Sequence, residues 1–217
     1  MLNKYLNKLE RKFGKFAISN LMLYIILGMG VFYVANMILS TNPDNRIHLY
    51  DMIFFSRYKI MQGEVWRVIS FVLMPPASSI IFFVFILYFY WMMGDALERR
   101  WGSFKFNIFY FTGMIGCIAA GFITGFATNT YLNLSLFLAF ALLFPNEEIM
   151  LFFVLPIKVK WIAIVDAIVI GADFIRGSFN TRIFILLSIG NLLLFFGKDM
   201  FTGCYYAIRR LYHNSQK

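Results

Sequence analysis

The feature that most constrains this chain is residues 21–39, an apolar run without a single charged side chain. A helix needs about 20 such residues to cross the roughly 30 Å hydrocarbon core of a bilayer. Backbone groups find no water in that core, so a spanning segment must satisfy its own hydrogen bonds as a helix. Five further apolar runs follow, at 78–93, 104–126, 131–144, 161–174 and 183–196. We therefore expect an all-α fold, a polytopic bundle of six transmembrane helices.

The composition also indicates a membrane protein. The chain is 60% hydrophobic and 14% charged, whereas soluble domains average about 45–50% and about 25%. The net charge of +9 fits the positive excess of cytoplasmic membrane loops, so we expect the lipid bilayer as a partner and no nucleic acid. Cys117 and Cys204 show neither metal-ligand spacing nor a disulfide framework. No metal and no cofactor is predicted.

Polar and mixed segments flank the spans. Residues 1–19 interleave leucines and phenylalanines at helical spacing with basic residues, which predicts an amphipathic helix on the membrane surface. Residues 20–197 form the predicted membrane domain, and 198–217 a basic cytoplasmic tail. The first loop, 41–76, is rich in aromatic side chains for a solvated segment. We expect it to lie partly in the membrane interface as short helices.

The distribution of Lys and Arg predicts the orientation of the bundle. With six spans, 14 of the 20 basic residues fall on one side: five in 1–19, three in 95–105, two in 145–160 and four in the tail. Cytoplasmic loops carry this excess, so both termini are expected to be cytoplasmic. The usage of Lys, Asn, Ile and Phe is compatible with a bacterial inner membrane.

Small residues indicate how the spans pack. They recur in the third span at intervals of three and four: Gly113, Gly116, Cys117, Ala120, Gly121, Thr124 and Gly125. Such a stripe lets helices approach closely, so we interpret it as a packing face. The short fourth span suggests a central helix shielded by longer ones.

A charged cluster separates the second and third spans. Gly94 and Glu98 are four residues apart and lie on one face of a helix, where Gly94 would admit a close neighbour. Glu98 is expected to accept hydrogen bonds from the loop that follows. Trp101 is an interfacial aromatic residue, and Gly102 can adopt the positive φ that ends a helix. Charges are costly at a span centre, so this cluster is predicted at a membrane boundary.

These motifs, in this order, resemble the rhomboid superfamily. In that family a Trp-Arg pair closes the first loop, as Trp66-Arg67 does here, and a G-x-x-x-E-x-x-W-G motif follows the second span, as Gly94 to Gly102 does here. The resemblance covers roughly 20–197 and implies the rhomboid-like six-helix fold.

The catalytic residues of the family do not carry over. Active rhomboids resemble one another in a G-x-S-x nucleophile at the start of the fourth span and a His in the sixth. Here Thr130 falls near the nucleophile position and Ser135 lies deeper, while the two histidines, His48 and His213, lie outside the sixth span. A hydroxyl without a nearby base is a weak nucleophile. The resemblance therefore implies an inactive member, a pseudoprotease, with no catalytic residue.

One intramembrane acid remains to be explained. Asp166 lies midway along the fifth span, and an intramembrane carboxylate marks a functional candidate. It can act as a structural carboxyl partnered by Asn133 or Asn191, as a base for Thr130, or in an ion pathway.

Inactive members of the superfamily, such as derlins, bind membrane-protein clients. By that resemblance we expect client binding through a lateral opening beside the second and fifth spans, where Asn133, Asn191 and Asp166 would satisfy polar groups of the client helix. Two alternatives stay open. One is an active intramembrane serine-type peptidase with a displaced dyad, and the other is an ion- or proton-coupled transporter that uses Asp166.

Overall fold

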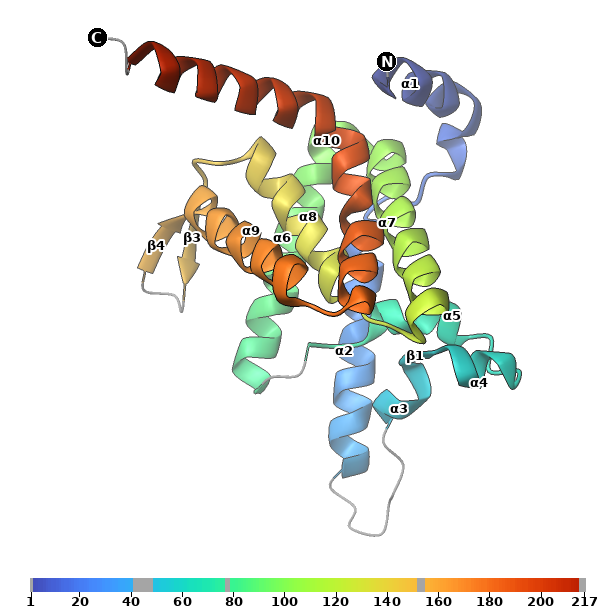
Figure 1. Ribbon diagram of the computed structural model, residues 1–217. Coiled ribbons are helices and arrows are strands. Elements are labelled where there is room, and N and C mark those ends of the chain that lie inside the picture. The colour runs from blue at the N-terminus through green and yellow to red at the C-terminus, as the bar shows by residue number, and fades with distance from the viewer. Residues whose placement is uncertain (1, 41–48, 77–78, 152–154, 215–217) are drawn as a thin grey trace.

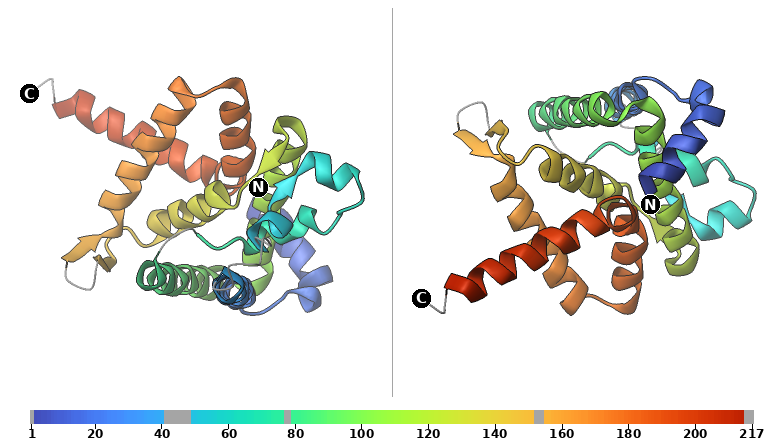
Figure 2. Two further views of the ribbon diagram at one scale, coloured as in Figure 1. Left: turned by 90° about the horizontal axis from the view of Figure 1, so that it is seen from below. Right: turned by 90° about the horizontal axis from the view of Figure 1, so that it is seen from above.

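The computed structural model describes residues 2–40, 49–76, 79–151 and 155–214, and it is a helical bundle (Figure 1). Six helices match the six predicted spans to within a few residues at most boundaries: α2 (Leu21–Ser40), α6 (Ile80–Trp101), α7 (Ser103–Thr124), α8 (Thr130–Leu143), α9 (Val159–Arg176) and α10 (Phe179–Asn214). The short α8 packs against α6, α7, α9 and α10, and Figure 2 shows it in their midst. The prediction of a shielded central helix is confirmed.

Six membrane spans are not confirmed, because fewer than six of the described helices have the length and composition of a membrane span. Three helices in the described ranges, α2, α6 and α7, are long and apolar enough to cross a membrane. A fourth is reached if Phe179–Leu187 and Ile189–Gly197 of α10, which meet at a bend of 44°, count as one span. The 14-residue α8 is short for a bilayer, and α9 carries two acidic and two basic residues. The all-α class is supported, whereas three or four spans, not six, have the required length and composition.

The first loop folds as short helices, as expected. It contains α3 (Leu49–Ile53), α4 (Arg57–Met61), α5 (Arg67–Ser70) and the 3-10 turn η2 (Phe71–Leu73). Sequence reasoning missed four short strands. Strand β1 (Phe55–Ser56) pairs antiparallel with β2 (Phe126–Ala127) and so ties the loop to the α7–α8 connection, while β3 (Glu148–Leu151) pairs with β4 (Leu155–Lys158) in a hairpin before α9.

Both terminal helices lie at one end of the bundle. Helix α1 (Leu2–Phe13), with the turn η1 (Gly14–Phe16), lies there together with the far part of α10, which turns away from the bundle (Figures 1 and 2). The apolar face of α1 is divided: Leu6 is buried against the domain, whereas Phe13 and Phe16 are exposed. The segment predicted as a polar tail continues α10 as helix to Asn214.

The small-residue stripe of α7 is a packing face, as predicted. A Cβ atom at Gly113 would lie 2.6 Å from Leu132 Cδ1 of α8 and 2.7 Å from Asn191 Nδ2 of α10. A Cβ atom at Gly121 would lie 2.6 Å from a ring carbon of Phe55. The stripe therefore admits α8, α10 and the first loop to the same helix.

Gly94 performs the corresponding role between α6 and α2. It is buried, and an added Cβ atom would lie 2.6 Å from Met22 Cγ. The side chain of Met22 is itself fully enclosed, so it has little room to withdraw. The close packing of α2 on α6 thus depends on the absence of a side chain at Gly94.

We expect Gly94→Ala to destabilise the protein by about 1–3 kcal/mol, because the new methyl group overpacks this crossing. The matched control is Gly171→Ala on α9, where a Cβ atom meets nothing within 4 Å among the described residues and stability should stay the same or rise slightly. Unfolding of both variants in detergent, followed by circular dichroism against denaturant, measures the difference. Equal stability of the two variants would contradict the packing role of Gly94.

Candidate functional site

The Gly94 to Gly102 motif joins four parts of the chain. Glu98 Oε1 accepts a hydrogen bond from the backbone N–H of Asn20, at 2.8 Å, and one from Ser103 Oγ, at 2.6 Å. Gly102 has φ +85° and its N–H donates to Glu98 O at 2.8 Å. The carboxylate therefore connects the start of α2, the end of α6 and the start of α7, and the expected hydrogen bond to the following loop is present.

Trp101 adds a fourth helix to this junction. Its ring centroid lies 5.4 Å from that of Phe109 on α7, 6.2 Å from Phe195 and 5.5 Å from Phe196, both on α10. Aromatic pairs at such separations stabilise packing beyond their buried area. The motif is a structural junction, since the described partners of the Glu98 and Trp101 side chains are Asn20, Ser103 and aromatic side chains of α7 and α10.

Arg67 fastens the first loop from within. Its side chain is only 2% exposed. Its Nε donates to Glu64 Oε2 at 2.6 Å, and one terminal nitrogen donates to Asp51 O at 2.7 Å and Phe54 O at 3.0 Å. Its neighbour Trp66 donates from Nε1 to Met52 O at 3.2 Å. A planar guanidinium with several fixed donors suits this arrangement, whereas an ammonium does not.

Further hydrogen bonds connect this loop to the bundle. Asn129, which precedes α8, donates from Nδ2 to Val72 O at 3.0 Å and to Met74 O at 2.8 Å. Arg57 donates to Phe122 O at 2.9 Å. Loop and α8 are thus fixed relative to each other at the end of the bundle where α8 begins.

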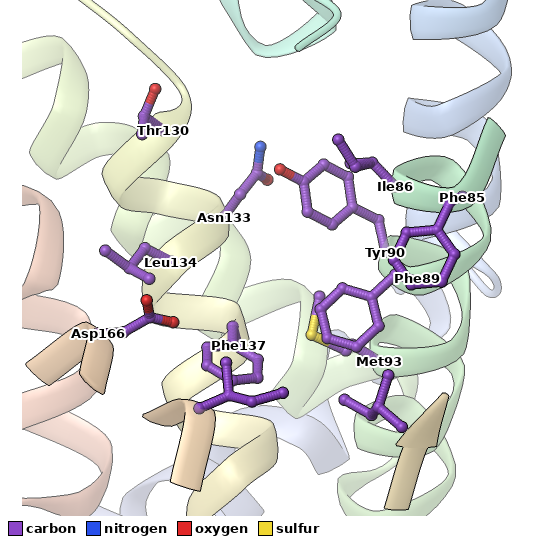
Figure 3. Close-up of a pocket in the computed structure, with 12 residues that line it drawn as sticks. Phe85, Ile86, Phe89, Tyr90, Met93, Thr130, Asn133, Leu134, Phe137 and Asp166 are labelled. Carbon is purple, nitrogen blue, oxygen red and sulfur yellow. The ribbon is translucent and has the colours of Figure 1, made fainter. Parts of the chain in front are cut away.

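A cavity of about 500 Å³ lies between α6 and α9, with α8 along its floor (Figure 3). We call it the lateral cavity. Its walls are mostly apolar and aromatic, with Phe85, Ile86 and Phe89 from α6 and Ile162 from α9. A mostly apolar pocket with a few convergent polar groups is the usual form of a binding site.

Four polar side chains line the lateral cavity: Tyr90, Thr130, Asn133 and Asp166. Asn133 and Tyr90 point toward one another across it (Figure 3). Asn133 is only 4% exposed, and its Oδ1 has no hydrogen-bond partner in the described part of the chain. A buried acceptor left in this state costs about 1–3 kcal/mol.

The structure divides the residues that the sequence singled out. Thr130, Asn133 and Asp166 meet in the lateral cavity, but Asn191 lies elsewhere, 2% exposed, between α7, α8 and α10. Its Nδ2 donates to Phe109 O and to Ser135 Oγ, both at 3.3 Å. Both of these partners are internal to the bundle, so Asn191 is placed apart from the lateral cavity, and its expected contact with a client stays a prediction.

Among the described residues, neither candidate nucleophile is hydrogen-bonded to a basic group. Ser135 is fully buried and donates to Leu132 O at 2.7 Å. Thr128 donates to Thr130 Oγ1 at 2.6 Å. Within the described ranges, the hydrogen-bond partners of both hydroxyls are backbone, amide or hydroxyl groups.

Asp166 and the two histidines lie in separate parts of the chain. Asp166 is half-buried in the wall of the lateral cavity. His48 lies outside the described residues, and His213 lies in the part of α10 that turns away from the bundle. No cluster of three potential metal ligands occurs among the described residues.

Sequence reasoning missed Tyr90 and the aromatic wall around it. The second span contains Phe85, Tyr88, Phe89, Tyr90 and Trp91, and a bulky aromatic run gave no sign of which rings turn inward. The signal was the position of Tyr90 on the same helix face as Ile86 and Met93, at intervals of four and three.

A scan of the chain against models of known protein families finds no match, and a search of curated proteins finds no similar sequence. The functional assignment therefore depends on the residues and the geometry of the chain itself.

We expect Arg67→Lys to destabilise the protein by about 1.5–3 kcal/mol, because one ammonium cannot reach the three acceptors that the guanidinium bonds. Arg99→Lys is the matched control, since Arg99 makes an exposed pair with Asp95, and exposed pairs are worth about 0–1 kcal/mol. Thermal unfolding in detergent measures both variants. If Arg67→Lys unfolds at the temperature of the control, Arg67 does not fasten the loop.

We expect a fluorophosphonate probe to leave the folded protein unlabelled above the denatured control. Hydroxyls without a nearby base react slowly, and the described partners of Thr130 and Ser135 include none. Thr130→Ala and Ser135→Ala serve as reference variants. Labelling of the native chain that either variant abolishes would show an activated hydroxyl and would favour the peptidase alternative.

Proposed function

We propose that the chain is a rhomboid-like integral membrane protein that binds a transmembrane segment of a client protein in the lateral cavity and does not cleave it. The rhomboid relationship is proposed from the order of the motifs in the sequence. Its support in the structure is that Arg67 and Glu98, the polar residues of the two motifs, each make several internal hydrogen bonds.

The size of the lateral cavity limits how a client binds. About 500 Å³ holds several side chains but no complete helix, which is about 10–12 Å wide. A client helix would lie along the opening between α6 and α9 and insert the side chains of one face. The wall residues Phe85, Ile86 and Ile162 would contact its apolar groups.

The single observation that carries this proposal is the buried amide of Asn133 on the floor of an apolar cavity: it faces the Tyr90 hydroxyl, and its Oδ1 accepts no hydrogen bond from the described residues. In a dry site an unpaired acceptor is costly, and it favours a ligand that brings a donor. A hydroxyl, amide or freed backbone N–H of a client helix would supply that donor. Tyr90 and Asp166 line the same cavity and would add polar contacts.

We expect a photo-crosslinking amino acid at Ile162, in native membranes, to capture a client that the same amino acid at Ile168 does not capture. Both residues lie on α9, but Ile162 lines the cavity and Ile168 is 65% exposed on α9 outside the lining. Mass spectrometry of the adducts identifies a membrane-spanning peptide in the first case.

Asn133→Leu provides the decisive variant. It keeps the approximate volume of the side chain and removes the acceptor, so capture at Ile162 should fall about tenfold, the loss expected for one buried hydrogen bond of about 1.4 kcal/mol. Undiminished capture in this variant, or equal capture at Ile162 and Ile168, would refute specific binding in the lateral cavity.

A further inference from the structure

A second cavity, of about 320 Å³, lies where α1 meets the turn between α6 and α7. We call it the basic pocket. It shares no lining residue with the lateral cavity. Its lining includes Leu6 and Asn7 of α1, the helix that lies at one end of the bundle in Figure 1. Its lining combines three polar side chains, Asn7, Arg100 and Lys105, with apolar side chains that include Trp101, Leu143 and Phe196.

Helix α1 builds one side of the basic pocket by docking on the bundle. Leu6 is buried there, and Lys105 Nζ lies 3.4 Å from Glu10 Oε2. These two contacts, four residues apart on α1, fix one face of the helix to the domain. The pocket is therefore a product of the folded chain, since neither α1 nor the α6–α7 turn forms it alone.

The charges of the basic pocket do not cancel. Lys105 is paired with Glu10, and Arg99 is paired with Asp95. The side chain of the adjacent Arg100 is exposed and makes neither an ion pair nor a hydrogen bond with the part of the chain that the structure describes. One guanidinium thus stays available, with the ammonium of Lys105 in the same pocket.

We propose that the basic pocket binds an anionic phospholipid, independently of the function proposed above. The phosphate accepts hydrogen bonds from Arg100 and Lys105, since a guanidinium matches the geometry of phosphate. The start of an acyl chain lies against Leu143 and Phe196. Basic pockets between membrane helices suit such head groups.

Two observations favour a lipid over a soluble phosphate. The basic pocket combines cations with apolar side chains, and a free phosphate would leave those side chains without a partner. Trp101 lines it as well, and indole rings concentrate at the level of lipid head groups. The exposed Phe13 and Phe16 beside the docked part of α1 would enter the same interface.

The test uses the full chain purified in detergent and native mass spectrometry to measure the affinity for phosphatidylglycerol and for phosphatidylcholine. We expect the wild-type protein to retain one phosphatidylglycerol with about tenfold preference. Arg100→Gln should weaken that binding about tenfold, the loss of one charge-assisted hydrogen bond. Binding of phosphatidylcholine should not change.

Arg99→Gln is the matched control, because it removes the neighbouring charge outside the basic pocket and should alter the affinity less than twofold. Arg100→Lys keeps the charge and should keep the preference for phosphatidylglycerol. Equal binding of both lipids, or an equal loss in Arg99→Gln and Arg100→Gln, would overturn the proposal. Displacement of the lipid by millimolar inorganic phosphate would also overturn it, in favour of a soluble anion.

Discussion

The structure depends on the carboxylate of Glu98. It receives the backbone N–H of Asn20 and the hydroxyl of Ser103, and so sets the relative positions of α2, α6 and α7, the three helices that are most suited to cross a membrane. Asn20 has a positive φ of 56°, a conformation that Asn tolerates better than most residues. The chain turns sharply at Asn20 before α2 begins, and the backbone N–H of Asn20 finds its hydrogen-bond acceptor in the Glu98 side chain. Trp101, three residues on, extends the same junction to α10.

The helices of the bundle are not packed equally closely, and the lateral cavity lies beside the least buried of them, α9. Helix α7 packs closely on α10 and α8 through its glycines, and α2 packs on α6 through Gly94. Helix α9 packs on α8, α10 and β4. Its only buried side chain over the described range Val159–Arg176 is that of Val159, the first residue of the helix. Because α9 is buried only at its first residue, its apolar side chains that line the lateral cavity, such as Ile162, are left uncovered. The closely packed α6 and α8 and the loosely packed α9 thus line a space with Asn133 on its floor.

Much of this architecture is predictable from the sequence, for local reasons. Apolar runs bounded by glycine, proline and charge define α2, α6 and α7, and the spacing of Gly94, Glu98 and Gly102 predicts the end of α6. Features that depend on tertiary contacts are not predictable in this way. Strands of two residues, such as β1 and β2, show no alternation of polarity. Asn133 and Asn191 are both amides within apolar runs, and only the packing of α8 and α10 decides that one faces a cavity and the other faces Ser135.

The contacts of Glu98 also impose an order on assembly. The acceptor for the N–H of Asn20 lies 78 residues further along the chain, and Lys105, the partner of Glu10, follows later still. While the chain is being synthesised, α1 and the start of α2 emerge long before either partner exists. The hydrogen bond of Asn20 and the ion pair of Glu10 can therefore form only after α6 and the start of α7 have been synthesised. The pocket beside α1 also includes Leu143 and Phe196 from later in the chain, so the complete surroundings of α1 are among the last parts of the bundle to be synthesised.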